Sequence, residues 1–431
     1  MAALAGVPFG LVIGEAADSK GTCAGIGGND VRIAMIAYAL YPLDPRVARA
    51  AEALAESGHE VDVFAISLDG TKAGSGSGSI RVRLLPIRQK RAGLSRYFFE
   101  YGVFLSWAFA QVTLLHARRK YRVVYVHNMP NFLVFAGLFP KISRAKVVLD
   151  VHDPAAELMA DIRGRDLPPW ARRFANAEER LSISFSDTVI TVNESMRRRL
   201  SAMSSRPVSV VMNIPDTRHF VPQAASRDEG GAQWIVYAGS IAYRNGVDLV
   251  VRAVALLADE FPLLRFRVVG EGPALESVAR LAEDLGVTDR VEFRGLVPNE
   301  EIPAVLSDAS AGISSQRGGA FGSLVFSMKV AEYVALGVPV ICAATATMRH
   351  YFSGDDLLFF EPENPADLAR AIRAHLANPA AAAERAASSQ AKLAELGWPV
   401  QKETLVGTVE ALASSQEKDN QEKDKETTKY A

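Results

Sequence analysis

Short apolar runs alternate with amphipathic segments from Val31 onward. Residues 31–40 are almost entirely apolar, residues 47–57 have the composition and spacing of a helix, and residues 59–66 form a second apolar run. An unbroken apolar run is typical of a strand covered on both faces of a parallel sheet. Gly58 is suited to end the intervening helix. The pattern therefore predicts a strand–helix–strand unit at this end of the chain.

The same alternation continues in two series, separated by a stretch without periodicity. Residues 214–233 are rich in Pro, Gly and Asp and read as an interdomain linker. The chain is too long for a single core, so we predict an α/β protein of two Rossmann-like, doubly wound domains, residues 31–213 and 234–398. The further predicted strands are residues 81–85, 123–127, 146–151, 188–192 and 209–212 before the linker, and 234–238, 265–269, 290–294, 311–314 and 339–342 after it.

The two ends of the chain differ from this pattern. Residues 1–30 are rich in Gly and Ala, and their apolar centre, residues 11–13, is too short for a signal peptide. Nine of the sixteen residues 416–431 are charged and show no apolar period. We expect a disordered leader over 1–30 and a disordered, solvated tail over 414–431.

Composition is that of a globular enzyme. The 431 residues are 49% hydrophobic and 23% charged, with a net charge of −1, which gives no indication of a nucleic-acid partner. Cys23 and Cys342 lie far apart, and neither belongs to a metal or redox spacing. We find no zinc, calcium or P-loop spacing, so neither metal nor cofactor is expected. A reducing compartment, the cytoplasm, fits.

Residues 326–340, FSMKVAEYVALGVPV, carry the most informative motif. Ser327 opens a predicted helix, Lys329 and Glu332 lie on one face of it, and Gly337 ends it. A helix that begins with a small residue presents unpaired N–H groups and a positive dipole end, which suit a phosphate. Glu332 could reach a ribose diol and Lys329 a diphosphate. An ordinary amphipathic helix is the alternative interpretation.

This motif resembles the nucleotide-sugar motif of retaining glycosyltransferases of the GT-B fold, family 4 or glycosyl transferases group 1. The form S-x-K-x-x-E-Y, here SMKVAEY, is similar to one subgroup of that family. The resemblance covers roughly residues 31–414 and implies two domains facing a central cleft, with the helix 399–413 crossing back onto the first domain. It implies that Ser327, Met328, Lys329 and Glu332 bind the donor, with Glu332 on the ribose.

Two further segments of the second domain resemble donor-binding loops of the family. Residues 237–249, YAGSIAYRNGVDL, contain Gly239, Ser240, Arg244 and Asn245, and residues 268–273, VVGEGP, contain Glu271. The family usually has cations where Ser240 and Asn245 stand, so Arg244 or Lys329 would have to supply the charge. It also has a glutamate where Leu324 stands. In the family, the protein contacts the nucleobase mainly through its backbone, so the side chains do not indicate whether the donor is linked to UDP or to GDP.

Polar residues follow predicted strands of the first domain. His152 and Asp153 come directly after the strand 146–151, and the family places a histidine there, near the donor sugar and the acceptor. We therefore expect His152 to be catalytic and Asp153 to face the acceptor, with His127 a second candidate. Asp44 and Arg46 also lie on the acceptor side, although helix capping explains them equally well.

Residues 81–122 combine basic and aromatic character. Ten Lys and Arg residues stand against one acid, Glu100, and flank an aromatic segment of about twenty residues. One interpretation is a core helix. The other is a monotopic face that meets an anionic membrane and a polyprenyl-linked acceptor, which would place the protein on the inner face of the membrane.

The resemblance implies a retaining, metal-independent hexosyltransferase. It would move a sugar from a UDP- or GDP-linked donor to a lipid-linked or polysaccharide acceptor in cell-surface glycan synthesis. Two alternatives stay open. A GT-B sugar-nucleotide epimerase shares the fold, and the departures at Ser240, Asn245 and Leu324 would suit a protein that binds nucleotide sugar without transferring it.

Overall fold

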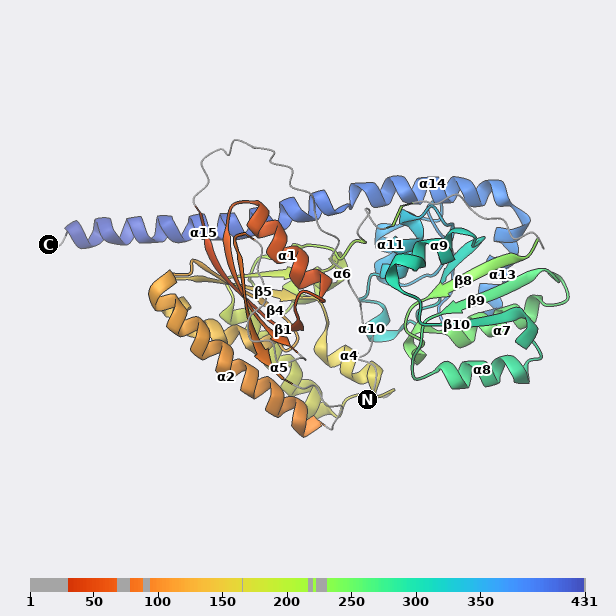
Figure 1. The fold of residues 1–431 in the computed structure, drawn as a ribbon, viewed down its shortest axis with the longest axis horizontal. Coiled ribbons are helices and arrows are strands. Elements are labelled where there is room, and N and C mark those ends of the chain that lie inside the picture. Colours follow the sequence, from red (N-terminus) through yellow and green to blue (C-terminus); the bar gives the residue numbers. More distant parts are fainter. Residues whose placement is uncertain are drawn as a thin grey trace.

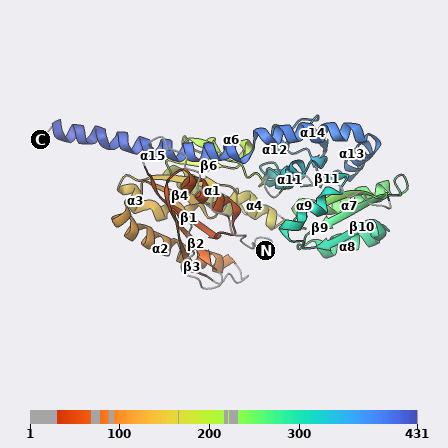
Figure 2. The ribbon, with the colours of Figure 1, turned by 45° about the horizontal axis from the view of Figure 1, so that its top comes forward.

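The computed structural model describes residues 30–67, 78–87, 94–164, 166–215, 220–221 and 231–429. The leader predicted for residues 1–30 and most of the predicted linker lie outside these residues. Two α/β domains lie side by side along the long axis, and the helices of the C-terminal end run along one edge of both (Figure 1, Figure 2).

The first domain contains a sheet of seven parallel strands in the order β3-β2-β1-β4-β5-β6-β7. The predicted doubly wound topology is confirmed. The bounds of the predicted strands differ from the observed ones by at most two residues at an end. The strands are β1 (Arg32–Leu40), β2 (Glu60–Ser67), β3 (Ile80–Pro86), β4 (Val123–His127), β5 (Lys146–Val151), β6 (Thr188–Thr191) and β7 (Val208–Val210).

Helices cover both faces of this sheet. Helix α1 packs on one face, and α2, η1, α5 and α6 pack on the other. Asp44 caps α1, since its Oδ1 accepts from the N–H groups of Arg46 and Val47 at 3.0 and 3.1 Å. The elements are α1 (Pro45–Glu56), α2 (Leu94–Arg119), η1 (Asn131–Gly137), α3 (Leu138–Ile142), α4 (Ala155–Ile162), α5 (Pro169–Phe185) and α6 (Glu194–Ser201).

The second domain contains six parallel strands in the order β10-β9-β8-β11-β12-β13. Sequence analysis missed β13, because three residues at a sheet edge give too short an apolar run to be distinguished from a loop. The strands are β8 (Gln233–Ala238), β9 (Leu264–Val269), β10 (Val291–Gly295), β11 (Ala311–Ser314), β12 (Val340–Ala343) and β13 (Leu358–Phe360).

The second domain's helices connect these strands and cover its sheet. They are η2 (Tyr243–Asn245), α7 (Val247–Leu257), α8 (Leu275–Asp284), η3 (Thr288–Arg290), η4 (Asn299–Glu301), α9 (Ile302–Ser307), α10 (Gly319–Gly322), α11 (Met328–Ala335), α12 (Ala346–Tyr351), α13 (Pro365–Ala377) and α14 (Pro379–Glu395).

The last helix, α15 (Trp398–Lys429), returns to the first domain. Leu405, Val409 and Ala413 are buried in the first domain's core, on the same face of the sheet as α1. The structure corrects the prediction of a disordered tail: residues 414–429 continue α15. Lys, Glu and Gln dominate this stretch and are good helix formers, so a helix already nucleated on the core extends through it.

Both sheets have a point where the strand order reverses, between β1 and β4 in the first and between β8 and β11 in the second. Loops at the carboxyl ends of strands diverge there, which is where open α/β sheets bind ligands. The residues singled out in the sequence follow these strands. Gly239 follows β8, and His127 ends β4.

Hydrogen bonds and an ion pair join the two domains. Nδ2 of Asn193 donates to the carbonyl of Leu324 at 2.8 Å, and the N–H of Glu194 donates to the hydroxyl of Tyr351 at 2.9 Å. Arg244 and Asp161 form an ion pair at 3.8 Å. The first domain's α4 and α6 therefore face the second domain's η2, α12 and the loop before α11.

Candidate active site

Glycines allow the loops after β8 and β9 to pack backbone against backbone. The N–H of Gly239 donates to Val269 O at 2.8 Å, and the N–H of Ile241 donates to Glu271 O at 2.8 Å. A Cβ on Gly270 would lie 2.1 Å from the carbonyl oxygen of Gly239, and one on Gly272 would lie 2.3 Å from that of Ile241. Only glycine fits at either position.

Helix α11 lies against the first of these loops. A Cβ at Gly239, whose φ is +139°, would meet Cε of Lys329 at 2.5 Å, so the lysine side chain crosses directly over the glycine. Its Nζ lies 5.3 Å from the ring centroid of Tyr237. Tyr333 fixes the other side of the helix, because its hydroxyl accepts from the N–H of Ala238 at 2.9 Å.

Burial shifts the two charged groups of α11 toward their neutral forms. It raises the pKa of Glu332 to about 7, against the opposing charge of Lys329. It lowers the pKa of Lys329, where Glu332 opposes the shift and Arg244 adds to it. Lys329 on α11 and Arg244 on η2 are thus close enough for their charges to oppose each other.

The first turn of α11 has no side-chain cap. Ser327 takes the N-cap position, but its Oγ pairs with Oγ of Ser314 at 3.0 Å instead of with the helix. No side chain therefore binds the N–H groups of this turn, which point beyond the start of the helix.

The other donor-side candidates are exposed or have their polar groups bound by the protein itself. Nδ2 of Asn245 donates to the carbonyl of Ser240 at 2.6 Å, and the Ser240 side chain is exposed. Glu271 is exposed, with its carbonyl tying the two glycine loops together. Leu324 packs against the apolar core of the first domain, so this position, where the family has an acid, holds an interdomain contact here.

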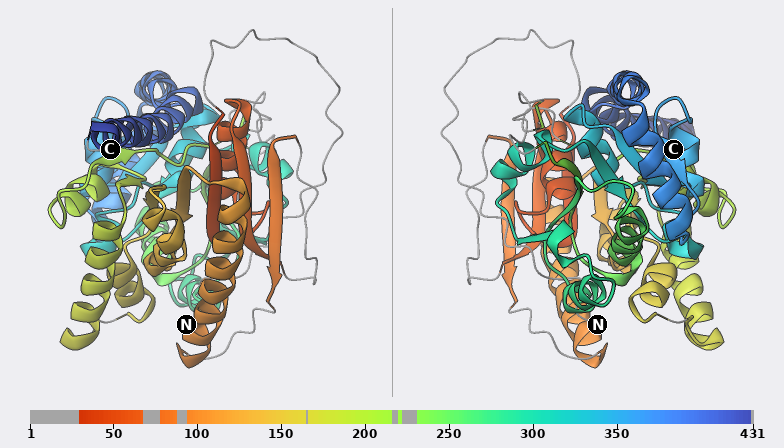
Figure 3. Two further views of the ribbon diagram at one scale, coloured as in Figure 1. Left: turned by 90° about the vertical axis from the view of Figure 1, so that its left-hand side faces the viewer. Right: turned by 90° about the vertical axis from the view of Figure 1, so that its right-hand side faces the viewer.

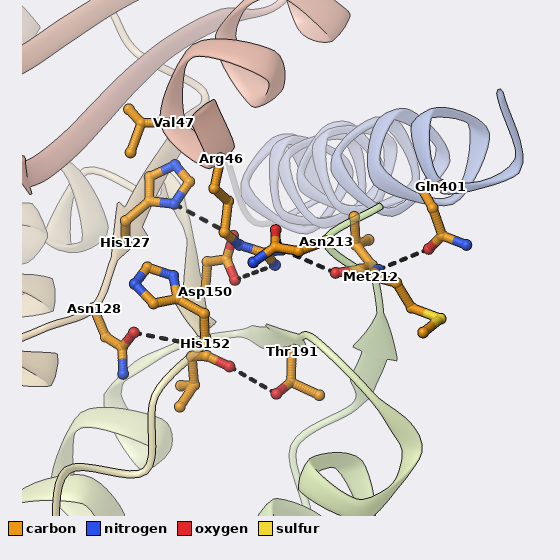
Figure 4. Close-up of polar contacts among 12 residues, drawn as sticks. Arg46, Val47, His127, Asn128, Asp150, His152, Thr191, Met212, Asn213 and Gln401 are labelled. Atoms are coloured by element: carbon orange, nitrogen blue, oxygen red, sulfur yellow. Dashed lines mark hydrogen bonds and ion pairs between the residues drawn. The ribbon is translucent and has the colours of Figure 1, made fainter. Parts of the chain in front are cut away.

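A buried carboxylate organises the first-domain side of the site (Figure 4). Asp150, 1% exposed, stands opposite His127 in the parallel register of β4 and β5. Its Oδ1 accepts from Nη2 of Arg46 at 2.6 Å, and its Oδ2 accepts from Nε of Arg46 at 3.0 Å and from the hydroxyl of Tyr125 at 2.9 Å. Burial alone would raise the pKa of Asp150, but Arg46 and His127 hold it well below its usual value.

Two imidazoles flank this carboxylate. Nδ1 of His127 lies 3.3 Å from Oδ2 of Asp150. His152 follows β5, two residues after Asp150 and on the same side of the strand, and its ring centroid lies 6.3 Å from that of His127. Asn128 holds the His152 backbone, since Oδ1 accepts from its N–H at 3.0 Å. Burial lowers the pKa of His152, against Asp153 and Asp150, so the neutral ring prevails near neutral pH.

Ligand atoms of His127, Asp150 and His152 lie within 4.8 Å of one another, a spacing that a metal ion could bridge. Both carboxylate oxygens of Asp150, however, already accept from Arg46. A divalent cation would have to bind beside that guanidinium or displace it, so the arrangement suits neutral imidazoles better than a metal.

The structure gives Arg46 a different setting from the one expected. All of its nitrogens donate to the protein: besides Asp150, Nη1 reaches Val211 O at 3.0 Å and Oδ1 of Asn213 at 2.8 Å. Asp44 is a helix cap, and the carbonyl of Asp153 accepts from Nδ2 of Asn128 at 2.8 Å. The assignment of Asp44, Arg46 and Asp153 to the acceptor side stays a prediction.

Sequence analysis missed Asp150 and Tyr125 as parts of the site. A signal was present, because KVVLDVHD contains a charged residue inside an otherwise apolar strand. A carboxylate in that position is costly to bury unless a partner from elsewhere compensates it. The partner, Arg46, is 104 residues away in sequence, and nothing local points to it.

Comparison with known proteins agrees with this geometry. Residues 43–215 match the glycosyl transferase 4-like domain, and residues 232–378 match the glycosyl transferases group 1 family. The two matches fall on the two sheets. The chain therefore belongs to the group 1 glycosyltransferases and has the GT-B fold.

Relatives of known activity are similar over different lengths. One relative is the GDP-mannose-dependent alpha-(1-6)-phosphatidylinositol monomannoside mannosyltransferase of Mycolicibacterium smegmatis, to which the chain is 30% identical over 168 residues. The aligned region covers 36% of this chain and 44% of that protein. The chain is 25% identical over 358 residues to the 2-deoxystreptamine glucosyltransferase of Streptomyces kanamyceticus, 78% of this chain and 89% of that protein. It thus spans less than half of the first relative and most of the second.

Solved structures share the fold at low identity. Sucrose-phosphate synthase from Thermosynechococcus elongatus superimposes with a TM-score of 0.71 at 19% identity, covering 89% of this chain and 100% of that one. HepE of Anabaena, in complex with UDP, gives a TM-score of 0.65 at 15% identity with the same coverage.

Proposed function

We propose that the protein is a retaining glycosyltransferase that moves a sugar from a UDP- or GDP-linked donor to a lipid-linked or polysaccharide acceptor in cell-surface glycan synthesis. The observation that carries this proposal is the arrangement of α11. Lys329 crosses the Gly239 turn, and Glu332 lies one turn further along the same helix. This arrangement lies in a chain whose two domains both match glycosyltransferase families.

The proposed donor site assigns a role to each charged group. Glu332 accepts from the ribose diol, while the first turn of α11, Lys329 and Arg244 receive the diphosphate. These cations and the helix dipole stabilise the departing diphosphate, so the reaction needs no metal. Arg244 takes over the charge that relatives carry at the positions of Ser240 and Asn245.

Retention follows from the same geometry in this proposal. The acceptor hydroxyl attacks from the face of the leaving diphosphate, which takes up its proton, so no pair of carboxylates at glycosidase spacing is required. His152 and His127 lie on the first-domain side and would bind hydroxyl groups of the reacting sugars. A neutral His152, as its lowered pKa favours, can either donate or accept a hydrogen bond there.

The acceptor proposal rests on the outer surface of the first domain. No helix in the described part of the chain combines the length and the apolar character needed to cross a bilayer. Large apolar side chains are nevertheless exposed on helices that cover one face of the first sheet. Two of these helices, α2 and α5, run away from α15 (Figure 3). Those side chains that are more than 60% exposed are Phe99, Leu114, Ile142, Trp170, Phe174 and Leu181.

Exposed cations stand on or directly after the same helices, among them Arg118, Lys120, Arg144, Arg173 and Arg180. Aromatic and aliphatic groups accompanied by cations suit the interface of an anionic membrane. Helix α2 combines the two interpretations made from the sequence: Phe104, Ala108 and Val112 belong to the core, while Phe99 and Leu114 face outward. We propose that this face brings the enzyme to a lipid-linked acceptor at the inner face of the membrane.

A second candidate function follows from the engaged groups on the donor side. Asn245 binds Ser240, and Leu324 is an interdomain contact, so the protein could hold a nucleotide sugar without transferring it. Calorimetric titration with UDP, GDP, UDP-GlcNAc, UDP-Glc and GDP-Man in the absence of metal separates the candidates. Micromolar binding of one nucleotide that Glu332→Ala weakens at least tenfold supports the donor site.

The same preparation is then incubated with the selected donor and lipid-linked acceptors. Sugar transfer with retained anomeric configuration supports the enzyme, and binding without transfer supports the second candidate. Absence of binding by all five compounds would contradict both. Glu283→Ala, at an exposed position of α8 in the second domain, is the matched control and should bind as the wild type does.

A further inference from the structure

The first domain contains two buried networks of the same composition. In one, Asp150 of β5 accepts from Arg46 and Tyr125. In the other, Asp62 of β2 accepts from both Arg119 and Tyr121. Both carboxylates are at most 2% exposed. Each network therefore satisfies a buried charge. In the first, His127 pairs with the carboxylate itself, whereas in the second His116 lies beside the ring of Tyr121.

The position of Asp150 determines which nitrogen of His127 carries the proton. A carboxylate 3.3 Å from Nδ1 favours the tautomer protonated there and leaves Nε2 as an acceptor. Both nitrogens of His127 and Nδ1 of His152 are buried and have no hydrogen-bond partner among the described residues, so the 3.3 Å approach of Nδ1 to Asp150 is an electrostatic contact without hydrogen-bond geometry. His127 is 1% exposed. Since Nδ1 of His127 faces Asp150, Nε2 of His127 and Nδ1 of His152 are the imidazole nitrogens with capacity to bind a ligand.

Arg46 fixes the carboxylate in this orientation. Its Nε and Nη2 hold the two oxygens of Asp150, while Nη1 is held by Val211 O and Oδ1 of Asn213, at the start of the segment that leads to the second domain. A planar guanidinium can make these bonds at once, which a lysine cannot. Its side chain is 9% exposed.

We propose that Arg46 and Asp150 are positioning residues that hold His127 with Nε2 as a hydrogen-bond acceptor for a sugar hydroxyl, beside His152. The inference deepens the function proposed above and rests on it for the identity of the ligand. Arg46 and Asp150 do not touch substrate themselves. They determine the tautomer of His127. The tautomer in turn determines whether Nε2 accepts a hydrogen bond from a sugar hydroxyl or donates one to it.

The test is the variant Asp150→Asn, because an asparagine amide donates to Nδ1 and so reverses the tautomer of His127. Since loss of the carboxylate leaves Arg46 buried without a counter-charge, the double variant Arg46→Gln with Asp150→Asn removes both charges. Nitrogen-15 spectra of histidine-labelled protein report the tautomer without any substrate. We expect the proton on Nδ1 in the wild type and on Nε2 in the double variant.

Activity gives the second measurement. We expect the double variant to lose at least tenfold in kcat, with nucleotide affinity within twofold of the wild type. Asp62→Asn is the matched control, since it neutralises a carboxylate of the same kind, and it should keep both the wild-type kcat and the His127 tautomer. An unchanged tautomer in the double variant, or a kcat within threefold of the wild type, would overturn the proposal.

A third outcome separates this proposal from the function itself. If the wild type transfers no sugar, the proposed function fails, but the tautomer measurement still decides whether Asp150 orients His127. A zinc titration of the wild type provides the last check. Zinc binding at micromolar concentration that disappears in His127→Ala would show a metal site and overturn the role proposed here.

Discussion

At the residue scale, Glu332 is buried, although its proposed role of accepting hydrogen bonds from the ribose is best served by a charged carboxylate. Burial raises its pKa to about 7, so a large fraction of the free protein carries a neutral carboxyl near neutral pH. Ribose hydroxyls donate to a carboxylate more strongly than to a carboxylic acid. Donor binding should therefore deprotonate Glu332.

We expect the affinity for a nucleotide sugar to fall as the pH is lowered from 8 to 6. Below the pKa the loss should approach about tenfold per pH unit, with release of one proton on binding. Titration calorimetry in buffers of different ionisation enthalpy measures that proton. Glu332→Gln should bind more weakly and without the pH slope. An equal slope in the variant would assign the titration to another group.

The raised pKa of Glu332 also affects stability. Since the folded value, about 7, exceeds the ordinary value of 4.5, the folded state binds the proton more tightly than the unfolded state. Its contribution to stability is complete below pH 4.5 and is lost as the pH rises through 7. Bound nucleotide should reverse this trend, because it favours the charged form.

The sequence marks two glycines on the donor side, but it does not show why glycine is required at these positions. The motif VVGEGP marks Gly270 and Gly272 as special in sequence. The structure shows that the requirement is the approach of one loop to another, with no room for a Cβ between Gly270 and the carbonyl of Gly239. That approach depends on β8 and β9 being neighbours in the sheet.

At the element scale, α15 follows α14 of the second domain and packs on the first domain from Trp398 onward. Leu405 and Val409 are at most 1% exposed and lie among the buried residues of β1 and α1. Met212, which follows β7, donates its N–H to Oε1 of Gln401 at 2.7 Å, so the first turn of the helix is tied to the same domain. The helix is thus an integral part of the first core.

Leu405→Ala should destabilise the first domain by about 2–5 kcal/mol, because it leaves a cavity in a packed core. Hydrogen exchange followed by mass spectrometry separates the domains: peptides of β1 and α1 should exchange faster, while those of β8 and β9 keep their rates. Glu403→Ala, at an exposed position on the same helix, is the control and should change stability by less than about 0.5 kcal/mol. Uniform exchange in both variants would show that α15 does not stabilise this core.

At the scale of the whole molecule, α2, α3 and α5 carry exposed apolar side chains, and α2 and α5 cover the face of the first sheet opposite α15. We expect the protein to bind vesicles containing phosphatidylglycerol more strongly than vesicles of phosphatidylcholine alone. The double variant Trp170→Ser, Phe174→Ser should bind the anionic vesicles at least fivefold more weakly, because aromatic side chains anchor at the interface.

Leu256→Ser is the matched control for vesicle binding, since Leu256 is 60% exposed on α7 of the second domain. It should bind the vesicles as the wild type does. Co-sedimentation measures all three proteins, and nucleotide titration verifies that the donor site is intact. Equal sedimentation of the double variant and the wild type would contradict the membrane face.

The sequence by itself determined the elements, the two domains and the donor motif, because each depends on local order. Apolar periodicity reports strands and helices, and SMKVAEY with its flanking turns is contiguous. The elements that the sequence failed to predict are also explained by their local composition. The edge strand β13 was too short to recognise, and the charged end of α15 has the composition of a solvated tail as well as of a helix.

Only the tertiary structure decided which residues share the first-domain site. Parallel pairing of β4 and β5 places His127 opposite Asp150, and the start of α1 brings Arg46 onto the same carboxylate across 104 residues of sequence. Likewise, only the packing of one domain on the other shows that Leu324 is an interdomain contact. Burial and charge pairing act between residues distant in the chain, so they appear only when the strands and domains are in place.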